Sequence, residues 1–268
     1  MKYIMFKRII LWSEFPEQVD WKKAQKLIDF KTEIYIAVKD KKQFLNYKKK
    51  IKSKNITINA WPVLTKEEGY WFSGFTPIKS IDKLKQYKGM NIKIDLEPQL
   101  PDFNYNNIKI LYWLIKLYLK KAKNKDYLKA TINWLANNNT KILANEFPLP
   151  RFYLEKLGIT IEKKKNITLQ LMAYTSPAGQ TLAPIIRIYN RIMLRKAVKQ
   201  NPDMSASVGL IGPGILKTEK YYKNTNEFYK DLKMLQDIGI KNVAIYSIDS
   251  ILKRENPEEW IKTLKGSI

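Results

Sequence analysis

Residues 90–98 place two carboxylates at the end of a short apolar strand. Asp95 and Glu97 alternate with isoleucine and leucine, and this period of two puts both carboxylates on the same face of the strand. Pro98 lacks the N–H that a β-ladder needs, so the strand ends there and leaves Glu97 near its carboxyl end. Two carboxylates in such a place suit general acid–base chemistry.

The chain contains no histidine and no cysteine. Histidine-based triads, disulfides and thiolate metal sites are therefore excluded. Proton transfer would fall to carboxylates, Tyr, Lys, Asn or Gln. A metal ion would need Asp and Glu alone as ligands, and no spacing in the sequence demands one. We expect neither a metal nor a cofactor.

Strand and helix patterns alternate along the whole chain. Runs typical of strands fall at residues 8–15, 33–38, 56–64, 92–97, 141–147, 168–174, 206–211 and 242–248, and amphipathic runs typical of helices separate them. Such alternation implies parallel strands joined by helical crossovers, and eight units in about 250 residues is the size of a (βα)8 barrel. We predict an α/β fold, a single (βα)8 TIM barrel, with residues 1–268 as one domain. An open doubly wound sheet is the alternative, but it usually has a glycine-rich first turn.

The carboxyl ends of barrel strands meet at one mouth, where chemistry is done. The predicted strand ends bring carboxylates, amides and aromatic rings to it: Trp12, Glu14, Asn59, Trp61, Asp95, Glu97, Glu146, Tyr174 and Asp249. The loop after the third strand adds Glu68, Tyr70 and Trp71. Aromatic faces stack on sugar rings, and carboxylates bind hydroxyls and cleave acetals. The sequence therefore predicts a carbohydrate site, with an oligosaccharide or polysaccharide as partner.

Two short motifs carry a resemblance to a known family. Asp95-Leu96-Glu97 on the fourth strand, with Tyr174 in Met172-Ala173-Tyr174 on the sixth, resembles the (βα)8 glycoside hydrolases, most of all the chitinase-type branch, family eighteen. The fourth-strand motif of that family is Asp-x-x-Asp-x-Asp-x-Glu. The resemblance implies that Glu97 protonates the glycosidic oxygen, that Asp95 orients an acetamido group for attack, and that the Tyr174 phenol helps to hold that group.

The sequence departs from this motif at three positions. Met90 and Lys93 stand where the family has its first and middle Asp, and Thr175 follows Tyr174 where an Asp is usual. Lys93 shares a face with Asp95 and lies one pleat deeper, and a buried ammonium needs a counter-charge. A Lys93–Asp95 pair would leave Glu97 as the better general acid. The alternative is a purely structural ion pair that fills the lumen.

A second catalytic scheme uses two carboxylates from different strands. Glu97 would be the acid, and Glu146, Glu14 or Asp249 the base or nucleophile, with the spacing of the carboxyl groups deciding retention or inversion. Glu146 is the next best candidate, and a surface charge beside a helix is its alternative interpretation. The predicted seventh strand carries no carboxylate, which argues against the clan whose nucleophile lies there.

Two further functions stay open. A barrel that only binds carbohydrate would have much the same sequence. Gly212-Pro213-Gly214 after the seventh strand could bind a phosphate through backbone N–H groups, as in lyases and isomerases with this fold.

The formal net charge of +24 suits either a polyanionic partner or simply a lysine-rich surface. We favour the lysine-rich surface, because no nucleic-acid motif is present and the lysines are dispersed. No apolar run reaches the roughly 18 residues of a membrane span. We expect a cytoplasmic protein, with export and oligomeric state left open.

Overall fold

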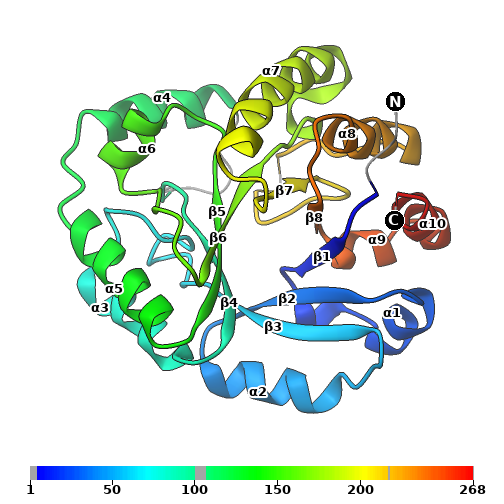
Figure 1. Cartoon of the computed structure of the whole chain (residues 1–268), viewed down its shortest axis with the longest axis horizontal. Coiled ribbons are helices and arrows are strands. Elements are labelled where there is room, and N and C mark those ends of the chain that lie inside the picture. Colours follow the sequence, from blue (N-terminus) through cyan, green and yellow to red (C-terminus); the bar gives the residue numbers. More distant parts are fainter. Residues whose placement is uncertain (1–4, 100–106, 217, 268) are drawn as a thin grey trace.

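The protein is a closed barrel of eight parallel strands in the order β1 to β8, as the sequence predicts. The computed structural model describes residues 5–99, 107–216 and 218–267. The strands are β1 (Arg8–Ser13), β2 (Thr32–Val38), β3 (Ile56–Pro62), β4 (Asn91–Asp95), β5 (Lys141–Glu146), β6 (Ile167–Met172), β7 (Ser205–Val208) and β8 (Asn242–Tyr246). Helices surround them (Figure 1).

The α-helices of the outer layer are α1 (Trp21–Leu27), α2 (Lys41–Lys50), α3 (Ile78–Asp82), α4 (Asn107–Tyr118), α5 (Lys125–Asn137), α6 (Arg151–Leu157), α7 (Gly179–Gln200), α8 (Thr225–Asp237), α9 (Ile248–Leu252) and α10 (Pro257–Lys265). Short 3₁₀ turns at Pro16–Gln18, Lys83–Tyr87 and Ser176–Ala178 complete this layer. Asp40 caps α2 by accepting a hydrogen bond from the Gln43 backbone N–H, as its position before a helical run predicts. Gly158 ends α6 at φ 63°, a conformation that favours glycine. The short α9 directly after β8 is not predicted by the sequence pattern.

Strand alternation divides the apolar core into two layers. Ile9 and Leu11 of β1 point outward and join the large cluster between strands and helices. Ile10 and Trp12 point inward and join the lumen cluster. Because side chains alternate across a strand, β1 contributes both to the packing between strands and helices and to the floor of the site.

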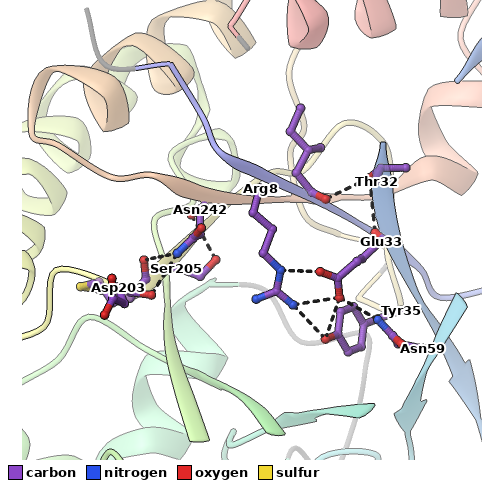
Figure 2. A network of polar contacts seen from close by, with 10 residues as sticks. Arg8, Thr32, Glu33, Tyr35, Asn59, Asp203, Ser205 and Asn242 are labelled. Atoms are coloured by element: carbon purple, nitrogen blue, oxygen red, sulfur yellow. Dashed lines mark hydrogen bonds and ion pairs between the residues drawn. The ribbon is translucent and has the colours of Figure 1, made fainter. Parts of the chain in front are cut away.

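The amino end of the lumen is closed by a polar network (Figure 2). The Arg8 guanidinium donates to the Glu33 carboxylate at 2.5 and 2.8 Å, and Asn59 Nδ2 donates to Glu33 at 2.8 Å. Asn59 was predicted at the mouth, and that placement is wrong. The last inward side chain of β3 is Trp61, so Asn59 lies one pleat, about 7 Å, deeper along the strand.

Candidate active site

A cavity of about 390 Å³ lies at the carboxyl ends of the strands. Seven residues expected at the mouth line it: Trp12, Glu14, Trp61, Trp71, Asp95, Glu97 and Tyr174. Apolar side chains from α4, α7 and the loops after β5 and β7 form its outer wall, among them Leu114, Phe147, Ile186 and Leu216. A cavity with apolar walls and a few convergent polar groups is typical of a ligand site.

The cavity floor is built on a buried ion pair. Lys93 Nζ lies 2.6 and 2.7 Å from the two Asp95 carboxylate oxygens, and neither residue is more than 2% exposed. Asn145 Nδ2 donates to Asp95 at 2.9 Å. The Lys93 ammonium also lies 3.5 Å from the ring centroids of both Trp12 and Trp61. Burial lowers the pKa of Lys93, while the Asp95 charge raises it.

Glu97 lies just beyond the end of β4, where the residues that follow β4 pair with the loop after β3. The Glu97 N–H donates to the Phe72 carbonyl at 3.1 Å, and a parallel bridge joins Phe72 to Leu96. Burial and the neighbouring Asp95 charge hold the pKa of Glu97 well above its usual range, although Lys93 opposes the shift. A carboxyl group that keeps its proton near neutral pH can act as a general acid.

Glu14 follows β1 and is held by two phenols. Tyr70 Oη donates to it at 3.1 Å, and Tyr246 Oη donates to its other oxygen. Burial raises the pKa of Glu14 to about 7, and the two phenol hydrogen bonds partly offset that rise. Tyr70 therefore reaches the site through Glu14.

Asp249, at the start of α9, supports the backbone of Glu14. It accepts hydrogen bonds from the Glu14 N–H at 2.7 Å and from Ser13 Oγ at 2.6 Å. Its carboxylate oxygens are thus engaged within the protein, and Asp249 is not among the residues that line the cavity. The structure gives it a role in positioning the turn after β1.

The sequence does not predict the outer wall of the cavity, nor two titratable cavity residues that interact with Glu14. Glu219, in the loop after β7, has a pKa raised to about 8 by burial and by the Glu14 charge, and it lines the cavity. It follows no strand pattern, so nothing in the sequence indicates its place. Tyr246 also lines the cavity, and strand alternation from the inward Ala244 would have found it.

Two further predicted site residues lie away from the cavity. Glu146 points out of the barrel and accepts hydrogen bonds from Thr160 Oγ1 and the Ile161 N–H, each at 2.8 Å. Burial raises its pKa to about 7. Its neighbour Asn145 takes the inward position on β5, so strand alternation excludes Glu146 from the lumen.

Glu68 also faces away from the site, because it pairs with Lys83 at 2.7 Å and accepts from Ser80 Oγ at 2.6 Å. Partial burial would raise the pKa of Glu68, but these partners outweigh it and lower the pKa to about 2. Glu68 thus anchors the loop after β3 to α3.

The glycines after β7 have a packing role. A Cβ on Gly212 would lie 2.9 Å from Ser250, and a Cβ on Gly214 would overlap the Tyr246 ring and hydroxyl. Close approach to α9 and Tyr246 explains these glycines without a phosphate. Thr175, where the resembling family has Asp, donates to the buried Asp231 behind the barrel wall.

Buried N–H donors around the cavity lack protein partners. Within the part of the chain that the structure describes, Trp12 Nε1, Trp61 Nε1 and Asn190 Nδ2 make no hydrogen bond, and all three residues line the cavity. Unpaired buried donors are costly, and a ligand with oxygen acceptors would satisfy them. The described residues contain no cluster of acidic side chains that could hold a metal ion.

Comparison with one solved structure supports the fold. The PgaB (BpsB) glycoside hydrolase domain from Bordetella bronchiseptica superimposes with a TM-score of 0.57 at 11% identity, over 97% of this chain and 99% of that chain. A family GH18 chitinase catalytic domain from the fern Peteris ryukyuensis gives a TM-score of 0.49 at 10% identity, over 97% and 99%. No protein-family model and no curated protein matches the chain.

The chain therefore has the (βα)8 fold of a glycoside hydrolase domain. Among the described helices, none has the length and apolar character to cross a membrane.

Proposed function

We propose that the barrel hydrolyses an oligosaccharide or polysaccharide, with Glu97 as the general acid. The observation that carries this proposal is the Glu97 carboxyl group, whose pKa is held well above its usual range on the wall of the mouth cavity. Among the described residues, no side chain donates a hydrogen bond to this carboxyl group, so its proton is available to a leaving-group oxygen.

The surrounding residues fit a sugar ring. Tyr174 and Asp95 line the same cavity as Glu97, as substrate-assisted hydrolysis of an acetamido sugar would require. The Lys93 ammonium covers one face of Trp12 and one of Trp61, and Trp71, which also lines the cavity, is a further aromatic ring on which a sugar could stack. The free indole N–H groups of Trp12 and Trp61 would donate to sugar oxygens.

A second candidate function is carbohydrate binding without turnover. One observation favours it: Lys93 and Asn145 already occupy both Asp95 oxygens. An Asp95 held in this way is less free to orient a reacting group. Under this alternative the cavity binds a saccharide and Glu97 only hydrogen-bonds it.

The deciding experiment compares two buried glutamates. Purified protein is incubated with oligosaccharides of neutral hexoses and of acetamido sugars, and new reducing ends are measured by mass spectrometry. We expect Glu97→Gln to lower kcat by about 10²- to 10⁴-fold, the usual contribution of a general acid, while calorimetry still detects binding. Glu146→Gln, which changes a glutamate outside the cavity, should leave kcat unchanged.

Three outcomes are informative. Equal rates for Glu97→Gln and the unmodified protein would refute the assignment of the acid. Saccharide binding that Trp71→Ala weakens, with no product at any pH, would establish the binding function instead. Absence of both binding and turnover across the panel would count against the carbohydrate site itself.

A further inference from the structure

Ten large apolar side chains are exposed on three neighbouring helices. We call this surface the α4–α7 face, and it consists of Leu111, Tyr112, Ile115 and Leu119 on and just after α4, Phe152 on α6, and Leu182, Ile185, Ile188, Tyr189 and Ile192 on α7. Nine of the ten are more than half exposed, among them Ile185 at 62% and Ile192 at 63%. Large contiguous apolar patches mark interaction sites.

Direct contacts join these helices into one surface. The Tyr118 ring of α4 stacks on the Tyr153 ring of α6 at 5.2 Å, and Tyr153 Oη donates to the Leu114 carbonyl. Tyr189 Oη of α7 donates to the Pro148 carbonyl, just before α6, at 2.6 Å. Figure 1 shows α4, α6 and α7 along the same edge of the barrel.

The spacing on α7 is that of an amphipathic surface helix. Leu182, Ile185, Ile188, Tyr189 and Ile192 recur every three or four residues and so share one side of the helix. The opposite side is anchored in the protein by Asn190 and Leu194, which are 2% and 0% exposed. Helix α7 therefore has two apolar sides: one packs against the barrel, and the exposed stripe is the other.

The charges on α4 and α7 have a single sign. Neither α4 nor α7 contains an Asp or Glu. On α7, Arg187 and Arg191 pair with acidic residues of neighbouring elements. In the described part of the chain, the exposed Arg195, Lys196 and Lys199 form no ion pair with any residue. An apolar stripe bordered by cations complements a surface with an apolar interior and an anionic rim.

We propose that the α4–α7 face binds the surface of an anionic lipid bilayer. Helices with an apolar stripe and basic flanks lie in the headgroup region with the stripe inserted about 5–10 Å. Anionic lipids attract each nearby Lys or Arg by about 1 kcal/mol, roughly fivefold in affinity per residue. Long basic side chains extend their ammonium or guanidinium groups to the phosphates while their methylene groups stay in the apolar region.

A second copy of the chain fits this face less well. A symmetric dimer would place the same patch of both copies together, so the cations of one copy would face helices α4 and α7 of the other, which contain no Asp or Glu. Two chains of formal charge +24 also repel each other, whereas an anionic bilayer neutralises the cations.

Bilayer binding would set the orientation of the barrel. Leu114 of α4 and Ile186 and Tyr189 of α7 line the mouth cavity, so the helices that carry the proposed membrane face also form the cavity wall. The mouth would then lie beside the bilayer surface. This inference stands whether or not Glu97 is a catalytic acid.

The test is vesicle co-sedimentation of the full chain. Vesicles of phosphatidylcholine alone are compared with vesicles of equal parts phosphatidylcholine and phosphatidylglycerol, at low and at physiological salt. We expect binding to the anionic vesicles, weaker binding at higher salt, and little binding to the neutral ones. Equal partitioning into both kinds of vesicle, or into neither, would overturn the proposal.

A charge variant distinguishes binding through the α4–α7 face from attraction by the net charge of the whole protein. Changing Arg195, Lys196 and Lys199 to Gln should lower the vesicle partition coefficient about a hundredfold, from roughly fivefold per residue. The matched control changes the exposed Lys48–Lys50 run at the end of α2 to Gln, with the same loss of charge elsewhere. Equal losses in the two variants would show nonspecific attraction and refute a dedicated face.

An apolar variant tests insertion. Ile185→Ser, Ile188→Ser and Ile192→Ser together should abolish binding at physiological salt, while Leu45→Ser with Ile78→Ser, which alters exposed apolar residues of α2 and α3, should not. Circular dichroism verifies the fold of each variant. A dimer in sedimentation equilibrium that the α7 serine variant dissociates, without vesicle binding by the unmodified chain, would assign the face to a second copy.

Discussion

Replacing Lys93 tests how the floor of the cavity is held together. Lys93→Met keeps an unbranched apolar stem of similar volume but removes the ammonium, and so leaves the Asp95 carboxylate buried with only Asn145 as a donor. Breaking one side of a buried ion pair costs about 3–5 kcal/mol. The contacts of the ammonium with two indole rings add roughly 0.5–2 kcal/mol each when desolvated, although these contributions are not additive.

We therefore expect the free energy of unfolding to fall by about 3–5 kcal/mol in this variant. Urea denaturation measures it, with an unchanged m-value as evidence that both proteins unfold in the same way. In a domain whose total stability is of order 5–15 kcal/mol, such a loss is unmistakable.

The double variant Lys93→Met, Asp95→Asn provides the control. Its amide can still accept from Asn145, and no unpaired charge remains, so most of the loss should be recovered, leaving about 1–2 kcal/mol for the altered hydrogen bonds. A single-variant loss below about 1 kcal/mol, or equal losses in single and double variants, would refute the buried-pair reasoning.

Three other predictions follow from buried groups. The folded pKa of Glu146, about 7, lies above its unfolded value of 4.5, so the folded state binds more protons and stability falls as pH rises from about 4.5 to 7. Glu146→Gln should remove up to about 3 kcal/mol of that fall in urea denaturation, and an unchanged pH slope would contradict this. Tyr246→Phe removes a donor to Glu14 and should raise its pKa above about 7, measured by carbon NMR titration; a lower pKa would show that the phenol does not stabilise the carboxylate. Gly214→Ala forces a methyl group against Tyr246 and should lower stability by about 1–3 kcal/mol in thermal unfolding, whereas a neutral effect would show that the loop relaxes freely.

The barrel follows from the sequence because its determinants are local. Period-two alternation, as around Ile10, Trp12 and Asp95, determines where the strands lie and which side chains point inward. All eight strands appear where the pattern predicts them. The alternation does not predict how deep in the lumen an inward residue lies. Asn59 shares the inward face with Trp61, and only the end of β3 at Pro62 decides which of them reaches the mouth.

Loops and outward faces were the least predictable parts of the site. Glu219 comes from a loop whose path depends on the packing of Gly214 against Tyr246, a contact between segments far apart in the chain. Glu146 does lie at the end of its strand, but Asn145 beside it takes the inward position, so Glu146 points out of the barrel. A shift of one residue moves a side chain to the other face of a strand.

The electrostatics of the cavity favour a neutral ligand despite the charge of the chain. The described residues that line the cavity include no Lys or Arg, and Lys93 beneath them is paired with Asp95. Burial raises the pKa of Glu14 to about 7 and that of Glu219 to about 8, and holds the pKa of Glu97 higher than normal as well. Near neutral pH the Glu97 and Glu219 carboxyl groups therefore favour their protonated forms and can donate hydrogen bonds, whereas Glu14 accepts hydrogen bonds from Tyr70 and Tyr246. Such a cavity offers no cation to a phosphate, and its proton donors and aromatic walls match the hydroxyl and ring oxygens of an uncharged saccharide.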